Sequence, residues 1–381
     1  MVDSFPLKLA LGNQFCNRTE EKAFLIHNIA QCRHTVLIAP RRYGKSSLVF
    51  NVVAELNTAV ASIDLFLAHD DLAVTKRILV GISQAVSHLM PANQKLLAKL
   101  QKLFGKFRVS LGINGFSIDA SIETSGLDPV DQIFSALQGV DALAKEQDKP
   151  IIVFIDEFQD ITEAKSAKSI QGAIRHIAQS TKHITFIFSG SNRRLLLELF
   201  DDKSKPLYML CDMLHVERMS SESYYPHLQA LAKAKWNQEL SPLVFEKIMT
   251  LTELHPYYVN MLCHEVWKNK HLPTMEAIFA AWQKCYEAQE DRLITELDKL
   301  TAKQKDILKA LAVQPTIEPT GHSFVRVSQM PASSISQTIR ALLDKDMVYR
   351  IKKIDEAVPA LEKNQIRVLD PLLAYALKKY A

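Results

Sequence analysis

The chain lacks long apolar runs and has few cysteines, and these absences exclude several classes of protein. No stretch approaches the ~18 apolar residues of a transmembrane helix, so we expect no membrane span. The first residues, Met1 to Pro6, lack the basic start and continuous apolar stretch of a secretory signal. The five cysteines are scattered and lack metal-ligand spacing: Cys16, Cys32, Cys211, Cys263 and Cys285. We therefore expect a reduced, cytoplasmic protein with free thiols.

Low-complexity segments and internal repeats are also missing from the sequence, and its charge is modest. A formal net charge of +4 does not by itself indicate a nucleic-acid-binding protein. Apolar residues make up 48% of the chain and charged residues 23%, which is typical of a globular protein. A length of 381 residues is enough for two or three domains.

The most informative segment is Ala39-Pro-Arg-Arg-Tyr-Gly-Lys-Ser46. It follows a strand-like run, Thr35–Ile38, and precedes a helix-like run, Ser47–Ala54, which is the setting of a phosphate-binding P-loop. The N–H groups at the helix start attract an anion, and Gly44 lets the backbone approach it. Lys45 is predicted to reach the β- and γ-phosphates, and the Ser46 hydroxyl to bind Mg²⁺. Ala39 replaces the usual first glycine, which requires a negative φ there.

Buried strands alternate with helices through the first half of the chain, which predicts a doubly wound α/β fold with a parallel sheet. Ligands in such sheets bind beyond the carboxyl ends of the strands, where Lys45, Asp156 and Ser189–Asn192 stand. The expected helices begin at Thr19 and cover 73–104, 130–147 and 165–181, and the expected strands are Thr35–Ile38, Ala59–Leu65, Pro150–Ile155 and Ile184–Phe188.

Two alternating runs flank Asn114-Gly115, which predicts a β-hairpin insertion at about 106–122. In this register Ile113 pairs with Phe116, so that one face of the hairpin is wholly apolar. The hairpin either covers a sheet edge or grips a substrate.

After about residue 215 the strands stop. Residues 219–297 read as helices, with Pro242, Pro256 and Pro273 near their starts. Beyond 298, a helix at 301–313, a short segment at Phe324–Val327, a helix at 332–344 and a strand-like run at Met347–Ile351 suggest a winged helix. The predicted domains are therefore 1–215, 216–297 and 298–381.

The strand at Pro150–Ile155 ends in two acids that suit a nucleotide site. Asp156 is placed to hold a Mg²⁺ shell, and Glu157 to orient and deprotonate the attacking water. Adjacent residues on a strand point opposite ways, so the two acids would take different tasks. The alternative is an ordinary acidic strand end. Similarly, Ser189–Asn192 either contacts the γ-phosphate or caps the helix that starts at 193.

In this order, the motifs resemble the P-loop ATPases of the AAA+/STAND assemblage, in particular the prokaryotic ATPase family first described mainly from archaea and related to initiator-type AAA+ proteins. The matching stretches run from near residue 15 to the C-terminus: Phe15–Glu21, Ala39–Leu48, Val153–Gln159, Ser189–Arg193, Pro206–Tyr208, His255–Tyr258 and the 298–375 region with Asp370-Pro-Leu-Leu.

The resemblance implies an αβα P-loop core, a helical lid and a winged helix, with ATP or ADP and Mg²⁺ as cofactors. It implies that Arg18 lies near the base and that His255-Pro256 closes over the nucleotide; from the residues alone, His255-Pro256 indicates only a helix start. With Glu157 and Lys45 as catalytic residues and Ser46 and Asp156 as metal ligands, the candidate nucleotide-binding residues are Arg18, Ala39, Pro40, Arg41, Arg42, Tyr43, Gly44, Lys45, Ser46, Ser47, Ser191, His255 and Pro256.

The chain departs from this family at three places. Ala39 replaces the first P-loop glycine, and Leu254 stands where glycine often precedes His-Pro. Met209-Leu210 follow Pro206-Leu-Tyr208, where the family often has Gly-Arg, a candidate arginine finger. A finger is worth about 10³–10⁵ in rate, so its loss favours slow turnover or a nucleotide-bound switch. Arg193 or Arg194 either substitutes for it or is a solvated helix charge.

Three functions follow: a slow ATPase switch, a DNA-binding ATPase (regulator, initiator or mobile-element helper), and a nucleotide-stabilised adaptor without useful hydrolysis. The region 300–381 is basic, with thirteen Lys/Arg against eight Asp/Glu. It would take DNA or a protein partner, and the chain would be a monomer or a nucleotide-dependent homo-oligomer. The candidate recognition helix, Pro331–Asp344, offers Ser333, Ser334, Ser336, Gln337, Thr338 and Arg340 to phosphates or bases.

Overall fold

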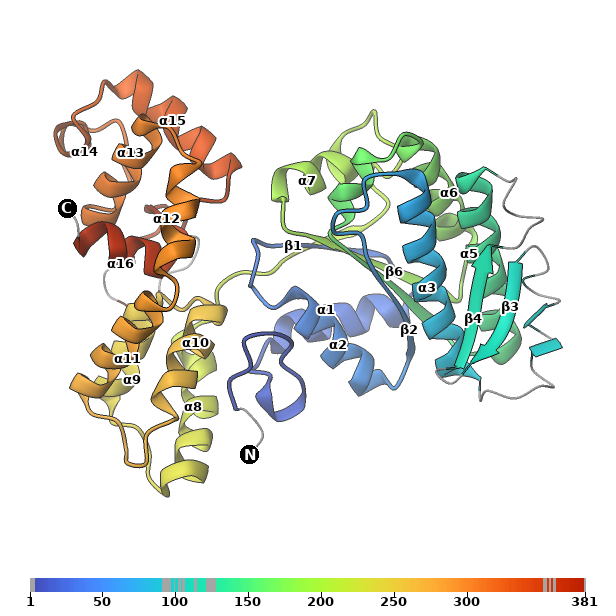
Figure 1. Cartoon of the computed structure of the whole chain (residues 1–381), viewed down its shortest axis with the longest axis horizontal. Helices are drawn as coiled ribbons and strands as arrows, with labels where there is room; N and C mark the ends of the chain where they lie inside the picture. Colours follow the sequence, from blue (N-terminus) through green and yellow to red (C-terminus); the bar gives the residue numbers. More distant parts are fainter. Residues whose placement is uncertain are drawn as a thin grey trace. The chain divides into compact units, whose positions relative to one another are not determined.

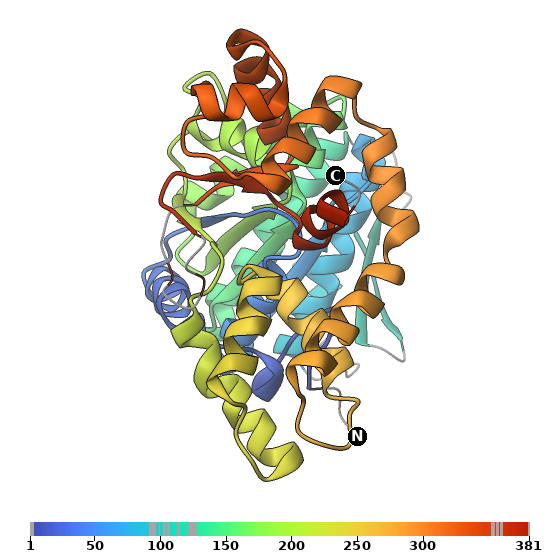
Figure 2. The same cartoon turned by 90° about the vertical axis from the view of Figure 1, so that its left-hand side faces the viewer.

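The computed structural model describes residues 4–90, 97–98, 100–101, 104, 107–112, 115–120, 128–351, 355, 358 and 361–379. The chain forms two compact units (Figures 1 and 2). The core unit comprises Arg18–Arg41 and Lys45–Glu217, and the C-terminal unit comprises Met1–Asn17, Arg42–Gly44 and Arg218–Ala381.

The core unit is built on a parallel sheet that has five strands among the described residues, in the order β2-β5-β6-β1-β7. The strands β1, β5 and β6 are almost wholly buried, as continuous apolar runs predict. The edge strand β7 was not predicted, because its half-exposed residues give no apolar pattern. The strands are β1 (Thr35–Ile38), β2 (Ala59–Asp64), β5 (Ile151–Asp156), β6 (Ile184–Gly190) and β7 (Asp212–His215).

Helices cover both faces of this sheet. Figure 1 shows α1 and α2 on one side and α3, α5, α6 and α7 on the other, which right-handed crossovers require for this strand order. Asp70, Asp128 and Asn192 begin three of the helices by accepting a backbone N–H from their first turn. The helices are α1 (Thr19–Ala30), α2 (Lys45–Leu56), α3 (Asp71–Leu89), α5 (Pro129–Gln147), α6 (Ala167–Ser180) and α7 (Arg193–Asp201), with short 3₁₀ turns at Gly12–Gln14 and Phe158–Glu163.

The predicted hairpin is present as β3 (Phe107–Gly112) and β4 (Gly115–Ala120), but its predicted register is wrong. Phe116 pairs with Leu111 rather than with Ile113, which lies outside the described residues together with 121 and 122. The two registers differ by an even number of residues, so every side chain keeps its face and alternation cannot distinguish them. Ile118 is buried, and its backbone N–H donates to the Ser83 hydroxyl of α3, so β4 packs on that helix.

The helical part of the C-terminal unit follows the proline pattern. Pro242 and Pro256 each occupy a first-turn position, as expected for a residue without an N–H group. The segment before the core joins this part, because the buried Phe5 ring contacts Trp267 with 4.7 Å between ring centroids. The helices are α8 (Ser221–Trp236), α9 (Pro242–Thr252), α10 (Pro256–Val266), α11 (Met275–Glu287) and α12 (Glu290–Asp298).

The last part of the chain is a second group of helices with a two-stranded sheet, coloured dark orange to red in Figures 1 and 2. The predicted helix 332–344 is α15, and the short segment predicted at Phe324–Val327 is helical. The elements are α13 (Ala302–Val313), α14 (His322–Ser328), α15 (Ala332–Asp344), β8 (Val348–Arg350), β9 (Ile366–Val368) and α16 (Pro371–Lys379).

Two expectations from composition can be compared with this fold. Within the described ranges, no helix has both the length and the apolar character that crossing a bilayer demands. None of the five cysteines, all of which are described, forms a disulfide.

Candidate nucleotide-binding site

The loop between β1 and α2 is compatible with the one backbone condition that its sequence sets, a negative φ at Ala39. Arg42 and Gly44 have φ of 65° and 83°, whereas Ala39 is not among the residues with positive φ, so alanine is accommodated there. A Cβ on Gly44 would meet no atom within 4 Å. The left-handed φ of Gly44 therefore favours glycine at this position.

Lys45 is the first residue of α2, with Ser46 and Ser47 following in the first turn. The Lys45 side chain is buried, and its Nζ donates to the carbonyl oxygens of Ala39 and Pro40, each at 3.1 Å. The ammonium group therefore lies against the backbone of its own loop, where a phosphate bound to that loop would meet it.

Asp156 brings the end of β5 to the start of α2. The Ser46 Oγ donates to Asp156 Oδ2 at 2.8 Å, although the two residues are 110 positions apart. The other carboxylate oxygen, Oδ1, accepts from the Glu157 backbone N–H at 3.0 Å and from the Ser189 hydroxyl at the end of β6. Ser189 belongs to the Ser189–Asn192 stretch that was expected at this edge of the sheet, but it was left out of the candidate nucleotide-binding residues.

Glu157 does not lie on the strand. It follows the last residue of β5 with φ 50° and begins the 3₁₀ turn Phe158–Glu163, so the predicted strand alternation with Asp156 is wrong. Its Oε2 accepts from the Ser191 N–H at 3.0 Å, the Ser191 hydroxyl at 2.7 Å and Gln159 Nε2 at 2.7 Å. Burial raises the pKa of Glu157, but these hydrogen bonds and the Lys45 charge outweigh burial and leave the pKa below its usual value. The group is a carboxylate at neutral pH.

Ser191 also contacts the P-loop, because Arg41 Nε donates to its Oγ at 3.1 Å. The next residue, Asn192, caps α7 by accepting the Leu195 N–H at 3.1 Å. The two interpretations of Ser189–Asn192 therefore apply to different residues: Ser189 and Ser191 face the acids, and Asn192 begins the helix.

Gln159 is a further residue of this cluster that the site prediction omitted. Gln159 is only 4% exposed, and a Cβ on Gly190 would lie 2.0 Å from its Oε1, so any larger residue at the end of β6 would displace the amide. A polar residue two positions after an acidic pair resembles any loop residue, and the sequence gives no other signal for it.

The remaining predicted residues lie elsewhere. Arg18 is buried, and its Nη1 donates to Glu21 Oε1 at 2.8 Å and to the Glu217 carbonyl at 2.7 Å. In the C-terminal unit, His255 precedes Pro256 at the start of α10, and its ring centroid is 4.7 Å from that of Tyr43. The roles of Arg18 and His255-Pro256 toward a nucleotide stay predictions.

Arg42 and Tyr43 contact the C-terminal unit, with which they are grouped. The Arg42 guanidinium lies 4.4 Å from the ring centroid of Tyr257, and the Tyr43 hydroxyl accepts from Arg218 Nε at 3.2 Å. Arg218 also donates to the Leu369 carbonyl at 2.7 Å, so the loop side chains are tied to the residues that follow β9.

Two motifs of the C-terminal unit meet at Asp370. Its Oδ2 accepts from the Tyr258 hydroxyl and from Arg292 at 2.9 Å, while its Oδ1 accepts the backbone N–H groups of Leu372 and Leu373. The His-Pro-Tyr-Tyr and Asp-Pro-Leu-Leu stretches are therefore two halves of one contact.

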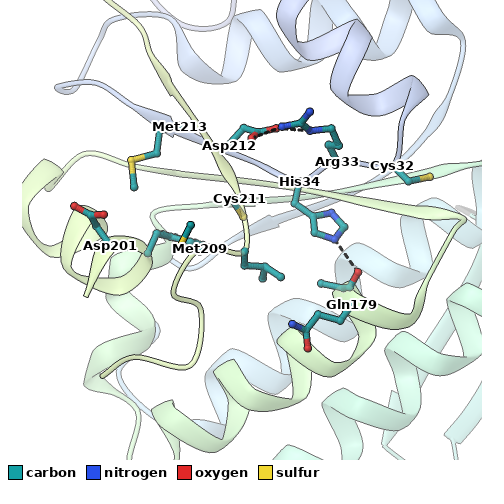
Figure 3. Close-up of a pocket in the computed structure, with 12 residues that line it drawn as sticks. Cys32, Arg33, His34, Gln179, Asp201, Met209, Cys211, Asp212 and Met213 are labelled. Carbon is teal, nitrogen blue, oxygen red and sulfur yellow. Dashed lines mark hydrogen bonds and ion pairs between the residues drawn. The ribbon is translucent and has the colours of Figure 1, made fainter. Parts of the chain in front are cut away.

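A hollow of about 540 Å³ lies at the other end of the sheet (Figure 3). Residues at the amino ends of β1 and β7 form part of its lining. Among them, Arg33 donates two hydrogen bonds to the Asp212 carboxylate, at 2.7 and 2.8 Å. His34 Nε2 bonds to the Ala178 carbonyl at 2.9 Å. This hollow is separate from the carboxyl ends of the strands, where Lys45 and Asp156 lie.

Comparison with known proteins agrees with this architecture. Residues 293–379 match a family model described as a probable winged helix domain, and no protein of curated function matches the sequence. The Walker-type ATPase PABY2304 of Pyrococcus abyssi has a similar structure, with a TM-score of 0.70 at 19% identity over 98% of this chain and 99% of that chain. The ADPNP–ADP form of the Aeropyrum pernix ORC2 protein has a TM-score of 0.57 at 14% identity, covering 96% and 93% of the two chains.

The fold is that of a P-loop ATPase with a C-terminal winged helix. The predicted α/β core with a parallel sheet is confirmed, and the fold resembles that of a Walker-type ATPase, as expected. At these identities the likeness concerns the fold alone.

Proposed function

We propose that this chain is a Mg-ATP-binding ATPase that turns over slowly and acts as a nucleotide-dependent switch. The observation that carries the proposal is the cluster of Lys45, Ser46, Asp156 and Glu157, in which Ser46 Oγ lies 2.8 Å from Asp156 Oδ2. A hydroxyl and a carboxylate at the end of a P-loop are the residue types that hold Mg²⁺ in this class of site. Bound there, the ion would neutralise charge on the β- and γ-phosphates.

The roles of the remaining side chains follow from their chemistry. The buried Lys45 ammonium would contact the phosphates in place of its own loop carbonyls. Glu157, already ionised, would accept a proton from the water that attacks the γ-phosphorus, while the bond to the β–γ bridging oxygen breaks and ADP leaves. ATP rather than GTP is chosen because of the family resemblance, and the ORC2 structure similar to this chain holds ADPNP and ADP.

Two features support slow turnover. Glu157 is held by Ser191 and Gln159, so it must exchange these bonds before it can face a water. Leu210, at the position where the family often has the arginine of Gly-Arg, carries no charge. Hydrolysis without a finger lacks a contribution of about 10³–10⁵ to the rate.

The switch would act through Tyr43. This loop residue contacts His255 and Arg218 within the C-terminal unit, and Arg218 also contacts Glu253 and the Leu369 carbonyl. A nucleotide that moves the loop would therefore shift contacts of the helical part and of the winged helix together. We include closure of the lid over the nucleotide in this proposal.

Phosphate release from Mg-ATP, with nucleotide binding measured in parallel, tests the proposal. Glu157→Gln keeps the hydrogen-bonding shape but loses the base, so binding persists and turnover falls by about 10²–10⁴. Lys45→Ala abolishes binding of both ATP and ADP. Equal turnover of Glu157→Gln and the unsubstituted protein would remove Glu157 from its role. Tight nucleotide with no release would instead favour the adaptor function.

A DNA-binding ATPase is the second candidate, favoured by charge in the winged helix. The region 300–381 carries an excess of basic residues, thirteen against eight acidic, and α15 exposes Ser333, Ser336, Gln337 and Arg340. Binding to a duplex, if it occurs through phosphates, weakens steeply with salt. ATP turnover that rises with duplex DNA at low salt and returns to the basal rate at high salt would support it, and turnover indifferent to DNA would reject it.

A further inference from the structure

Arg41 lies at the head of a hydrogen-bonded chain that ends on the proposed catalytic glutamate. Its Nε donates to Ser191 Oγ at 3.1 Å, and that hydroxyl lies 2.7 Å from Glu157 Oε2. A serine hydroxyl has a single proton, and the carboxylate can only accept. Because Arg41 occupies a lone pair of the Ser191 oxygen, it favours the rotamer in which the Ser191 proton is given to Glu157.

The same carboxylate is held from its other side. Gln159 Nε2 donates to Glu157 Oε2 at 2.7 Å and to Asp160 Oδ1 at 2.9 Å. Asp160 Oδ2 in turn accepts the backbone N–H of Leu67 at 3.1 Å. Glu157 therefore lies between two arms, one from the P-loop and one from the loop after β2.

These arms close into a ring at the loop after β2. The Arg41 guanidinium carbon lies 5.6 Å from the ring centroid of Phe66, the neighbour of Leu67. This contact orients the arginine toward Ser191 without neutralising it, because an aromatic face attracts a cation but carries no net charge. Arg41 itself is exposed, so its charge can be claimed by an anion bound at the P-loop.

We infer that Arg41 is a positioning residue that keeps Glu157 withdrawn until a nucleoside triphosphate binds. Its guanidinium then exchanges the neutral Ser191 hydroxyl for the γ-phosphate, the hydroxyl is free to turn, and Glu157 is released toward the water. The exchange is favoured because both partners are charged in a guanidinium–phosphate bond, whereas only the donor is charged in a bond to a hydroxyl. A diphosphate has no γ-phosphate and leaves the ring closed. This inference rests on the proposed function.

Nucleotide affinity tests the exchange without relying on turnover. Competition with a fluorescent nucleotide gives the affinities for ATP and ADP in the unsubstituted protein, in Arg41→Gln and in Arg41→Lys. Because Arg41→Gln loses a charge-assisted bond to the γ-phosphate, we expect it to weaken ATP binding by about ten- to a hundredfold relative to ADP binding. Arg41→Lys retains the charge and restores part of the preference. Arg33→Gln is the matched control, because Arg33 lies before β1 and pairs with Asp212 at the opposite end of the sheet.

The outcomes separate the two ideas. If the unsubstituted protein binds neither nucleotide, the proposed function fails and takes this inference with it. If it binds ATP and Arg41→Gln weakens ATP and ADP equally, only the inference fails. If Arg33→Gln changes the ATP-to-ADP ratio as much as Arg41→Gln does, the effect is one of general charge and the positioning role is rejected.

Discussion

Loss of Glu253 should strongly destabilise the C-terminal unit. It is only 7% exposed and stands between two guanidinium groups. Its Oε1 lies 2.7 Å from Arg367 Nη2, and its Oε2 lies 3.2 Å from Arg218 Nη1 and 3.1 Å from the Tyr349 hydroxyl. Burial raises the pKa of this carboxyl, but the two arginine charges outweigh burial and the pKa lies below its usual value.

Glu253→Gln keeps the size of the side chain and removes its charge. Two buried guanidinium groups are then left without their carboxylate, and breaking a buried ion pair on one side costs about 3–5 kcal/mol. The cost depends on pH with a definite sign. Since the pKa is lowered in the folded protein, the charge stabilises above the unfolded pKa of about 4.5, and that contribution is lost as pH falls through the folded pKa.

Urea unfolding followed by tryptophan fluorescence measures this cost in the C-terminal unit itself. All three tryptophans, Trp236, Trp267 and Trp282, belong to the C-terminal unit, so the signal reports that unit. The matched control is Asp298→Asn, which breaks an ion pair with Lys305. Because the Asp298 side chain is 70% exposed, this substitution should cost at most about 1 kcal/mol. If Glu253→Gln costs no more than the control, or if the difference from the unsubstituted protein persists unchanged well below pH 4.5, the reasoning about buried charge is wrong.

Three further substitutions are expected to change the stability of the protein, not all in the same direction. Gly190→Ala places a Cβ 2.0 Å from Gln159 Oε1, so we expect calorimetry to show a loss of about 1–3 kcal/mol, and an unchanged melting temperature would contradict the contact. Met209→Gly removes an exposed left-handed residue, of φ 53°, and should leave stability equal or raise it by up to about 1 kcal/mol; a clear loss would show that Met209 makes contacts that matter. Asp370→Asn loses the charge that faces Arg292 and should cost about 1–3 kcal/mol by tryptophan fluorescence, whereas a cost near zero would mean that the pair is fully screened.

The cluster at the candidate nucleotide site could be predicted because each part is a local pattern with one geometric outcome. A buried strand, a loop with Gly44 and a helix start fix where Lys45 and Ser46 lie along the chain. Parallel strands then bring Asp156 to the same edge, and the 2.8 Å contact with Ser46 follows from topology. The sequence determines less well which residue after β6 contacts Asp156 and Glu157. Ser189, Ser191 and Asn192 are all polar, and only the conformation of the turn after β6 decides which of them faces the two acids.

Other features were beyond the sequence for a different reason. The Glu253 cluster joins residues 35 to 114 positions apart, and nothing near Glu253 indicates that Arg218 or Arg367 will neutralise it. The hairpin register was missed because the alternating pattern fits two registers equally well. The strand β7 was missed because a half-exposed edge strand need not be apolar.

The departures from the family acquire a physical meaning at Leu254 and Met209. Both stand where the family often has glycine, and both have positive φ, 61° and 53°. Glycine adopts this conformation freely, whereas another residue costs about 1–2 kcal/mol. Leu254 is only 4% exposed, so burial of its side chain offsets the strain, but Met209 is 78% exposed and gains no such packing. The substitution at 254 is therefore compatible with the same turn, and that at 209 is strained without compensation.

This turn links the ion cluster to the His-Pro motif. Glu253 and Leu254 are consecutive left-handed residues, and they directly precede His255 and Pro256. Two such residues cost about 2–4 kcal/mol together, so the turn must be held from outside. Glu253 supplies that hold in two ways, because Arg218 donates both to its side chain and to its backbone carbonyl, the latter at 2.7 Å. Since Arg218 also donates to the Tyr43 hydroxyl, the P-loop side chain and the strained turn depend on one guanidinium. A displacement of Tyr43 would therefore weaken the restraint on the turn before His255, and this would be the physical basis for the coupling of the loop to the winged helix that we propose.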